Sequence, residues 1–401
     1  MMMPSKSAEI TISPVTTHAS ARRFLLIPIS VVFVLCLIES PAFIGAFDYR
    51  TVIGPEHLWW APNIVDPELL QVHRPHAHQS GAARGGLISW GYQIPESDKV
   101  LYQWDVTYDH NGFRNQSDLK SADMVVIGDS FVEGLTVPDS QLTTSLLARL
   151  QGDVVANLGQ SAYGPQQELV VLKRYGLPLQ PRTVVWMFFE GNDLEDVVAY
   201  RKATSNPDGF WKSFYLRSFS RNAAKGVKRI FFPPTKPSGA KRAAAFQASD
   251  GKTLTLYFVY LSPPLSDQHL SSIDETTRTI ATAHRLSAAQ GARLIFVFVP
   301  TKFRVFRDCC QFPQQSECRN WTVNDLPERL RKAVVSISPD IGFLDLTPRL
   351  AEDAKRGALP YYPDDDHWSP EGHKVAAEAI NDYLKSSGTQ PSVQLARRNR
   401  K

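Results

Sequence analysis

The feature that most constrains the fold is a series of short, nearly continuous apolar runs after residue 122, separated by stretches with helical periodicity. Runs of this kind suit parallel strands that are covered on both faces. Their alternation with helices predicts an α/β fold, a three-layer α/β/α sandwich around a five-stranded parallel sheet. The expected strands are 124–128, 154–159, 183–189, 294–299 and 342–346; the expected helices are 140–150, 165–175, 272–290, 325–337 and a last one capped by Ser369, with Pro370 in its first turn.

Another apolar segment lies near the N-terminus, at residues 24–47. It is long enough to cross a hydrocarbon core of roughly 30 Å with some tilt. Glu39 and Pro41 interrupt it, which leaves a cleaved signal peptide as an alternative. The residues that follow match a small-x-small cleavage site poorly, so we expect an uncleaved transmembrane helix.

The charges around this segment predict its orientation. Lys6, Arg22 and Arg23 precede the span and mixed charges follow it, so the positive-inside rule places the N-terminus in the cytoplasm. We therefore expect a single-pass protein of the inner (cytoplasmic) membrane with a periplasmic or otherwise extracytoplasmic main domain. The expected parts are a disordered N-terminus (1–23), the anchor (24–47), an extension packed on the main domain (48–121), the α/β domain (122–386) with an insertion (197–255), and a disordered basic tail (387–401).

The insertion is strongly basic. Within residues 201–242, eleven Lys and Arg side chains face a single acid, Asp208, and aromatic residues lie between them. This composition suits a surface that meets anionic lipid or an acidic glycan, and an ordinary helical excursion with a solvated basic face is the alternative. The net charge of the whole chain is only +4, and no nucleic-acid motif is present, so we expect no nucleic-acid partner.

Cysteine and histidine spacing predicts neither a metal site nor a cofactor. In an oxidising compartment Cys309 or Cys310 could pair with Cys318 and leave one thiol over; free cysteines in a surface loop are the alternative. His73, His76 and His78 alternate in a proline-bounded loop, which we interpret as a solvated polar segment.

Polar blocks follow each of the first three predicted strands, and another precedes the last helix. They are Ser130 after "MVVIGD", "NLGQSAYGP" (157–165), "EGND" (190–193) and "PDDDHWSPEGH" (363–373). Ligands of open parallel sheets collect at the carboxyl ends of the strands, so these blocks are expected to meet there.

Together they hold the groups that acyl transfer requires. The Ser130 hydroxyl needs an adjacent base, and His367 can take its proton and return it to a leaving group. An acid just before the histidine can orient the imidazole. Donors for the oxyanion are expected from the Ser130 amide, an amide near residue 162 and the Asn192 side chain.

In these blocks and their order, residues 105–385 resemble the SGNH hydrolases, also called GDSL esterases or lipases. "YDHNGFRN", "PTK" and "YYPDDDHWSPEGH" are most similar to a membrane-anchored bacterial branch that includes alginate O-acetyltransferase-like proteins. The resemblance implies a flavodoxin-like sheet, Ser130 as nucleophile, His367 as base, and Gly159, Ala162 and Asn192 around the oxyanion hole. For the acid, D-x-x-H spacing selects Asp364, and "Y-P-x-D-x-H-W" spacing selects Asp365; the flanking Pro363 and Trp368 favour Asp365.

The chain departs from the family pattern at two positions. Ala162 stands where the second block usually has glycine, and Glu190 stands where the third block usually has glycine. We expect the Ala162 amide to remain a donor, and we expect Glu190 to place a charge beside the site. Asp129 and Asp193 are interpreted as turn acids, Glu133 as a helix cap and His373 as a solvent-facing side chain.

The function expected from this combination is that of a serine esterase or O-acyltransferase acting on an acylated glycan or a small acyl ester, in contact with polysaccharide-biosynthesis proteins. A lipase or thioesterase is a second hypothesis, and a catalytically silent polysaccharide-binding subunit with the same fold is a third.

Overall fold

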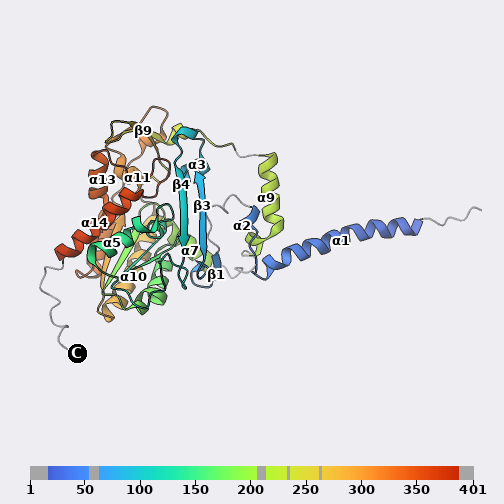
Figure 1. Ribbon diagram of the computed structural model, residues 1–401, viewed down its shortest axis with the longest axis horizontal. Coiled ribbons are helices and arrows are strands. Elements are labelled where there is room, and N and C mark those ends of the chain that lie inside the picture. The colour runs from blue at the N-terminus through green and yellow to red at the C-terminus, as the bar shows by residue number, and fades with distance from the viewer. Residues whose placement is uncertain (1–16, 54–62, 206–213, 233–234, 262–263, 388–401) are drawn as a thin grey trace, which may run out of the picture. The chain divides into compact units, whose positions relative to one another are not determined.

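The computed structural model describes residues 17–53, 63–205, 214–232, 235–261 and 264–387 (Figure 1). It divides into two compact units, one made of residues 1–57 with 208–234 and the other of residues 58–207 with 235–401. The segments predicted to be disordered lie largely outside the described residues, at 1–16 and 388–401.

The larger unit contains the predicted five-stranded sheet, in the order β12-β10-β7-β5-β6. Every neighbouring pair is parallel. The strand that comes first along the chain lies between the second and the third, which confirms the flavodoxin-like order. The strands are β5 (Met124–Gly128), β6 (Val155–Gly159), β7 (Thr183–Phe189), β10 (Arg293–Val299) and β12 (Gly342–Asp345).

Successive strand residues point to opposite faces of this sheet, and both faces are buried. Val126 and Met187 belong to one apolar cluster, whereas Val125 and Trp186 belong to the other. Helices cover each face, as the three-layer prediction required (Figure 1). The first cluster includes α5 (Thr143–Gln151), α13 (Thr347–Lys355) and α14 (Pro370–Ser387); the second includes α6 (Pro165–Val171), α7 (Asp193–Thr204), α10 (Asp267–Ala289) and α12 (Leu326–Ile337).

Three small antiparallel sheets accompany the main one, and the sequence did not resolve them. Residues of β4 alternate between exposed and buried, as in a strand covered on one face. The sheets are β1 (Asn63–Asp66) with β2 (Leu70–His73), β3 (His78–Arg84) with β4 (Leu101–Thr107), and β8 (Ala243–Gln247) with β9 (Thr253–Tyr257) and β11 (Cys310–Gln311). Short helices of this unit are α3 (Leu87–Gly91), α4 (Ser130–Glu133) and α11 (Lys302–Phe306), a π-helix (Leu172–Gly176) and 3-10 turns at Glu96–Asp98, Asp139–Gln141, Leu177–Leu179, Gly239–Arg242 and Glu317–Asn320.

The smaller unit contains α1 (Thr17–Phe43), α2 (Arg50–Ile53) and α9 (Phe219–Phe231). The stretch Leu26–Phe43 of α1 has a mean hydropathy of 2.2 and is long and apolar enough to cross a membrane, a judgement that rests on length and composition alone. Glu39 and Pro41, which interrupt the apolar sequence, both lie inside this helix.

Two local predictions have clear outcomes. The Ser369 Oγ accepts hydrogen bonds from the amides of Glu371 and Gly372, which confirms Ser369 as the cap of the last helix. Of the two alternatives for the cysteines, the structure has the one without a disulfide, with Cys309, Cys310 and Cys318 as free thiols. Cys318 is buried in the core cluster that includes β7 and β10, and Cys310 belongs to the small strand β11.

Candidate active site

Ser130 occupies the start of α4, directly after the sheet strand β5. The Asp129 carboxylate accepts a hydrogen bond from the Phe131 amide at 2.9 Å and caps this short helix, as expected of a turn acid. Because β5 is the strand at which the order along the sheet reverses, Ser130 lies where open α/β sheets bind their ligands.

A continuous chain of hydrogen bonds joins Ser130 to an acid through His367. The Ser130 Oγ lies 2.8 Å from the His367 Nε2. The His367 Nδ1 lies 2.6 Å from Asp365 Oδ1, which also accepts the His367 backbone amide at 2.9 Å. This is the arrangement of a nucleophile, a general base and a carboxylate that fixes the tautomer of the base.

The two candidate acids have different partners. Asp365 is also held by the Leu87 amide, at 2.7 Å from its Oδ2. Asp364 does not contact the imidazole; it is fully buried and accepts hydrogen bonds from the amides of Gly86 and Val100 and from the Tyr102 hydroxyl. The geometry therefore assigns the orienting position to Asp365 and leaves Asp364 to join the loop to the N-terminal extension.

The electrostatics agree with a base paired to a carboxylate. Burial alone would lower the pKa of His367, but the adjacent Asp365 carboxylate raises it to about 8. For Asp365 the effects act in the opposite sense: burial raises its pKa, and His367 with two backbone amides lowers it below the ordinary value. Each group stabilises the charged form of the other.

The predicted oxyanion donors are only partly available. Among the described residues, the amides of Ser130 and Ala162 have no acceptor, and both residues line the same cavity as Asn192. The Asn192 Nδ2 donates one hydrogen bond to Asp196 at 2.9 Å, which leaves its second N–H. The Gly159 amide, by contrast, already donates to the Asn157 Oδ1, so the prediction of Gly159 as part of the oxyanion hole was wrong.

Ala162 has a φ of 65°, in the left-handed region that favours glycine. The backbone conformation that glycine usually provides at this position is thus retained with an alanine, at a cost of about 1 kcal/mol. The left-handed backbone conformation directs the amide of Ala162 in spite of the altered side chain.

The cavity above Ser130 has a volume of about 340 Å³, and its far wall comes from the N-terminal extension. The sequence showed the polarity of this segment but gave no signal that placed it at the site. The contributing side chains are Asn63, Gln71, His73, Leu87 and Trp90, with Leu135, Thr136 and Tyr260 from the α/β domain.

Glu133 contributes more to this cavity than the predicted helix cap. Its carboxylate is fully buried and accepts hydrogen bonds from His73 Nε2 at 2.9 Å, the Tyr108 hydroxyl at 2.8 Å and the Ser161 amide at 2.7 Å. Burial alone would raise the pKa of Glu133, but His73 and Ser161 lower it to about 2. A carboxylate paired with His73 thus lies in the cavity wall, and it occupies the Ser161 amide.

The interpretation of the three histidines of the extension as a solvated segment was wrong for His73, which is buried, whereas His76 and His78 are exposed. His73 contacts Glu133 in the cavity, whereas His76 lies 3.9 Å from the exposed Asp118 and His78 lies 2.5 Å from the exposed Asp105. Among the described residues, no group of His, Cys, Asp and Glu side chains is arranged to hold a metal ion.

Two other predictions about side chains were wrong. Glu190 does not place a free charge beside the site, because its buried carboxylate is paired with Arg304 and accepts the Thr301 amide. His373 does not face solvent; it is 2% exposed, and its Nδ1 lies 2.9 Å from the Thr143 hydroxyl. Burial and the nearby charge of Arg114 lower the pKa of His373 to about 3.

Lys302 is a site residue whose role the sequence did not reveal. Its fully buried ammonium donates hydrogen bonds to the carbonyl oxygens of Tyr257, Tyr362, Pro363 and Asp365, at 2.6 to 3.1 Å. Three of these carbonyls belong to the loop that carries the acid and the base. A single cation therefore fixes the backbone from which Asp365 and His367 project.

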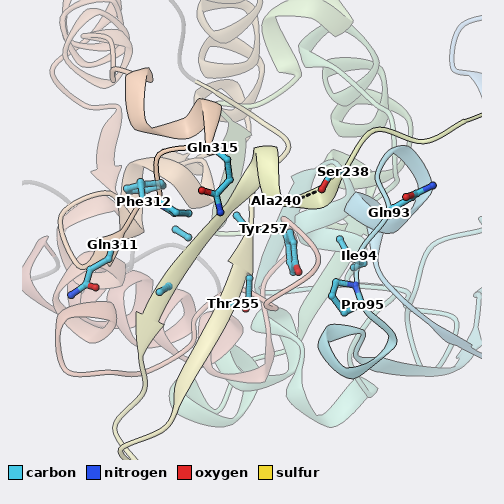
Figure 2. A pocket seen from close by; sticks show the side chains of 14 residues that line it. Gln93, Ile94, Pro95, Ser238, Ala240, Thr255, Tyr257, Gln311, Phe312 and Gln315 are labelled. Carbon is cyan, nitrogen blue, oxygen red and sulfur yellow. Dashed lines mark hydrogen bonds between the residues drawn. The ribbon is translucent and has the colours of Figure 1, made fainter.

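A larger depression, of about 780 Å³, lies on the β8–β9–β11 sheet and contains none of the predicted site residues (Figure 2). Gln93, Ile94 and Pro95 border one side, and Gln311, Phe312 and Gln315 border the other (Figure 2). We assign the chemistry to the smaller cavity because Ser130 and His367 lie there.

Comparison with known families agrees with this geometry. Residues 262–400 match the family model of the SGNH hydrolase-like domain of the acetyltransferase AlgX. The resemblance to the SGNH hydrolases is thereby confirmed, including the acetyltransferase branch. The matched segment contains Lys302, Asp365 and His367. Ser130 and Asn192 precede this segment in the sequence, and the fold brings them to the same cavity as His367.

The matches among solved structures include two with TM-scores of 0.35. A putative lipolytic protein of the G-D-S-L family from Desulfitobacterium hafniense shares 12% identity, with 65% of this chain and 98% of that chain covered and a TM-score of 0.35. An acetyl xylan esterase from the rumen bacterium Butyrivibrio proteoclasticus also shares 12% identity, with coverage of 72% and 70% and a TM-score of 0.35. No curated protein sequence matches the chain significantly.

Proposed function

We propose that the chain is a membrane-anchored extracytoplasmic serine esterase or O-acyltransferase that acts through an acyl-Ser130 intermediate. The observation that carries this proposal is the hydrogen-bonded series from Ser130 through His367 to Asp365. The acyl group would come from an ester-linked glycan of the cell envelope or an exopolysaccharide, or from a small acyl ester.

In the first half of the reaction, His367 Nε2 takes the Ser130 proton as Oγ attacks the ester carbonyl carbon. The amides of Ser130 and Ala162 and the free N–H of Asn192 stabilise the negative charge that develops on the carbonyl oxygen. The carbon–oxygen bond to the alcohol then breaks, and the imidazolium gives its proton to the leaving oxygen.

In the second half, His367 removes a proton from the acceptor, whose oxygen attacks the acyl-serine. Release of Ser130 regenerates the hydroxyl with the proton held by His367. A water molecule as acceptor gives hydrolysis, and a sugar hydroxyl gives transfer. The cavity of about 340 Å³ suits a short acyl group, which favours acetyl esters over long-chain lipids.

Anchoring by α1, with the N-terminus in the cytoplasm, completes the proposal. It predicts that protease added to spheroplasts digests the catalytic domain. Full protection of that domain in intact spheroplasts, with digestion after lysis, would contradict the orientation.

The direct test of the chemistry is turnover of a chromogenic acetyl ester by the wild type and by Ser130→Ala. We expect turnover by the wild type and a loss of several orders of magnitude in the variant. Equal turnover by both would refute the proposal that the chain is a serine enzyme. An acetyl donor supplied together with glycan oligomers then separates transfer from hydrolysis, because only transfer creates a new ester that mass spectrometry detects on the glycan.

A further inference from the structure

The helix α9 of the basic insertion has two chemically distinct sides. Helical spacing places Phe219, Ala223, Val227 and Ile230 along one stripe. Lys and Arg side chains lie on the opposite side, with no acid in the helix to balance them. The basic residues are Arg221, Lys225, Lys228 and Arg229.

The C-terminal half of the apolar stripe is uncovered. Val227 is 54% exposed and Ile230 is 76% exposed, and Phe231 and Phe232 beside them are 71% and 73% exposed. Consecutive large apolar side chains with this exposure normally mark a surface that contacts another apolar phase.

The basic side offers a place for an anion. Arg221, Lys225 and Lys228 border a hollow of about 330 Å³ together with Tyr215, whose ring lies 5.2 Å from the Arg221 guanidinium carbon. Among the described residues, these three cations have no carboxylate partner. A phosphodiester has the charge and the acceptor oxygens to satisfy them.

Several contacts fix the start of α9 to the C-terminal end of α1. Glu39 of α1 accepts hydrogen bonds from the amides of Phe219 and Ser220, at 2.9 and 2.7 Å, and so caps α9. Arg217, just before α9, donates to the Ala42 carbonyl. The acid that interrupts the apolar sequence of α1 therefore serves to attach a second helix.

Figure 1 shows α9 running across the end of α1 rather than continuing its direction. A helix that crosses the end of a membrane-spanning helix lies along the membrane surface. An apolar stripe, cations on the opposite side and this placement are the properties of an interfacial amphipathic helix.

We propose that α9 is an in-plane membrane helix that inserts Val227, Ile230 and Phe231 at the bilayer surface and binds anionic phospholipid through Arg221, Lys225 and Lys228. The inference rests on the membrane anchoring by α1 included in the proposed function. Each lysine or arginine near an anionic surface strengthens binding by about fivefold, so the cationic side makes the contact depend on lipid charge.

The test uses the full-length chain in nanodiscs of phosphatidylcholine alone or with phosphatidylglycerol, with the native cysteines replaced by alanine. Single cysteines at Ile230 (I230C) and at Lys228 (K228C) carry an environment-sensitive fluorophore. Lipids brominated near the headgroup act as quenchers for these two labels, and lipids brominated deep in the acyl chain act as quenchers for a label at Cys36. A third variant retains only Cys36, which lies within the apolar stretch of α1, and reports whether the anchor itself is inserted.

We expect the label at position 230 to shift to the blue and to be quenched in anionic nanodiscs, and the label at 228, on the basic side, to be quenched less than the label at 230. Lys225→Gln with Lys228→Gln should reduce quenching at position 230 to its level in neutral nanodiscs.

A solvent-like label at 230 beside a quenched label at Cys36 would overturn the inference while leaving the anchor intact. A label at 230 that is shielded without lipid quenching would also overturn it, by showing that protein covers the stripe: disulfide cross-linking through I230C would identify a second copy, and its absence the catalytic unit. Equal quenching in both lipids would refute the anionic selectivity, and an unquenched Cys36 would refute the anchor on which the inference rests.

Discussion

Replacing Asp365 with asparagine separates the two carboxylates that compete in the sequence for the orienting role. The Asp365→Asn side chain would keep its size but present no charge to the His367 Nδ1, 2.6 Å away in the native site. The imidazole would then lose both the preferred tautomer and the stabilisation of its protonated form. The corresponding change in serine proteases lowers kcat by roughly 10⁴, and we expect a loss of about 10³ to 10⁴, or about 4–5 kcal/mol of transition-state stabilisation.

The pH profile provides a second readout of the same change. Because His367 must be neutral to accept the Ser130 proton, and its pKa is about 8, wild-type kcat/KM should rise with pH and level off above about pH 8. In Asp365→Asn, burial still lowers the pKa of His367, but the Asp365 carboxylate that raises this pKa is gone. The rise of kcat/KM should therefore move to lower pH.

Asp364→Asn is the matched control, one residue away. Asp364 accepts hydrogen bonds from the Gly86 and Val100 amides and from the Tyr102 hydroxyl, and an amide nitrogen in place of one carboxylate oxygen would leave a buried donor unpaired. We expect a loss of about 1–3 kcal/mol in the free energy of unfolding, with kcat kept within about tenfold. Acetyl ester turnover and chemical unfolding measure both variants; a larger loss of kcat in Asp364→Asn than in Asp365→Asn would refute the assignment.

Three further substitutions test other parts of the account. Ala162→Gly should raise the free energy of unfolding by about 0.5 kcal/mol, because relief of the left-handed strain outweighs the added entropy of the unfolded chain. Activity should persist because the amide remains. A loss of stability in chemical unfolding would contradict this expectation. Lys302→Met should lower kcat more than it raises KM and should cost about 3 kcal/mol or more of stability, since four carbonyl oxygens lose their common donor; unchanged kcat would show that the loop is held by other contacts. His373 has a folded pKa of about 3, so the unfolded chain binds its proton first as pH falls below 6.5, and stability is lost in that direction. Between pH 6.5 and 5, protonation of His373 in the unfolded chain lowers the free energy of unfolding by about 2 kcal/mol. The variant His373→Gln retains a partner for Thr143 and should lose correspondingly less stability on acidification. Identical losses in the variant and the wild type would exclude His373 as the source.

The main sheet could be predicted because its strands are buried on both faces, so that Val125 and Val126, like Trp186 and Met187, must all be apolar. Strand ends and the order of polar blocks then indicated that Ser130 and His367 would meet. Asp365 could be favoured over Asp364 only through a family resemblance, because spacing within a loop does not determine which carboxylate faces the imidazole.

The rest of the site depended on tertiary contacts that leave weak traces in the sequence. His73 and Glu133 are 60 positions apart and meet only because the extension folds over the cavity. Glu190 appeared as an isolated charge because its partner Arg304 follows a different strand. His373 carries a helical surface pattern around it, yet α14 packs this position against α5. Lys302 gave no signal beyond its family motif, since its partners are backbone carbonyls, which every sequence has.

A covalent acyl-Ser130 intermediate is detectable by intact-protein mass spectrometry of the full-length chain mixed rapidly with an activated acetyl ester and quenched in acid. We expect a transient mass increase of one acetyl group, located at Ser130 by peptide mapping, absent in Ser130→Ala and formed far more slowly in His367→Ala. Turnover of the ester by the wild type without any acetylated peptide at Ser130, or an equal acetyl adduct in Ser130→Ala, would contradict it.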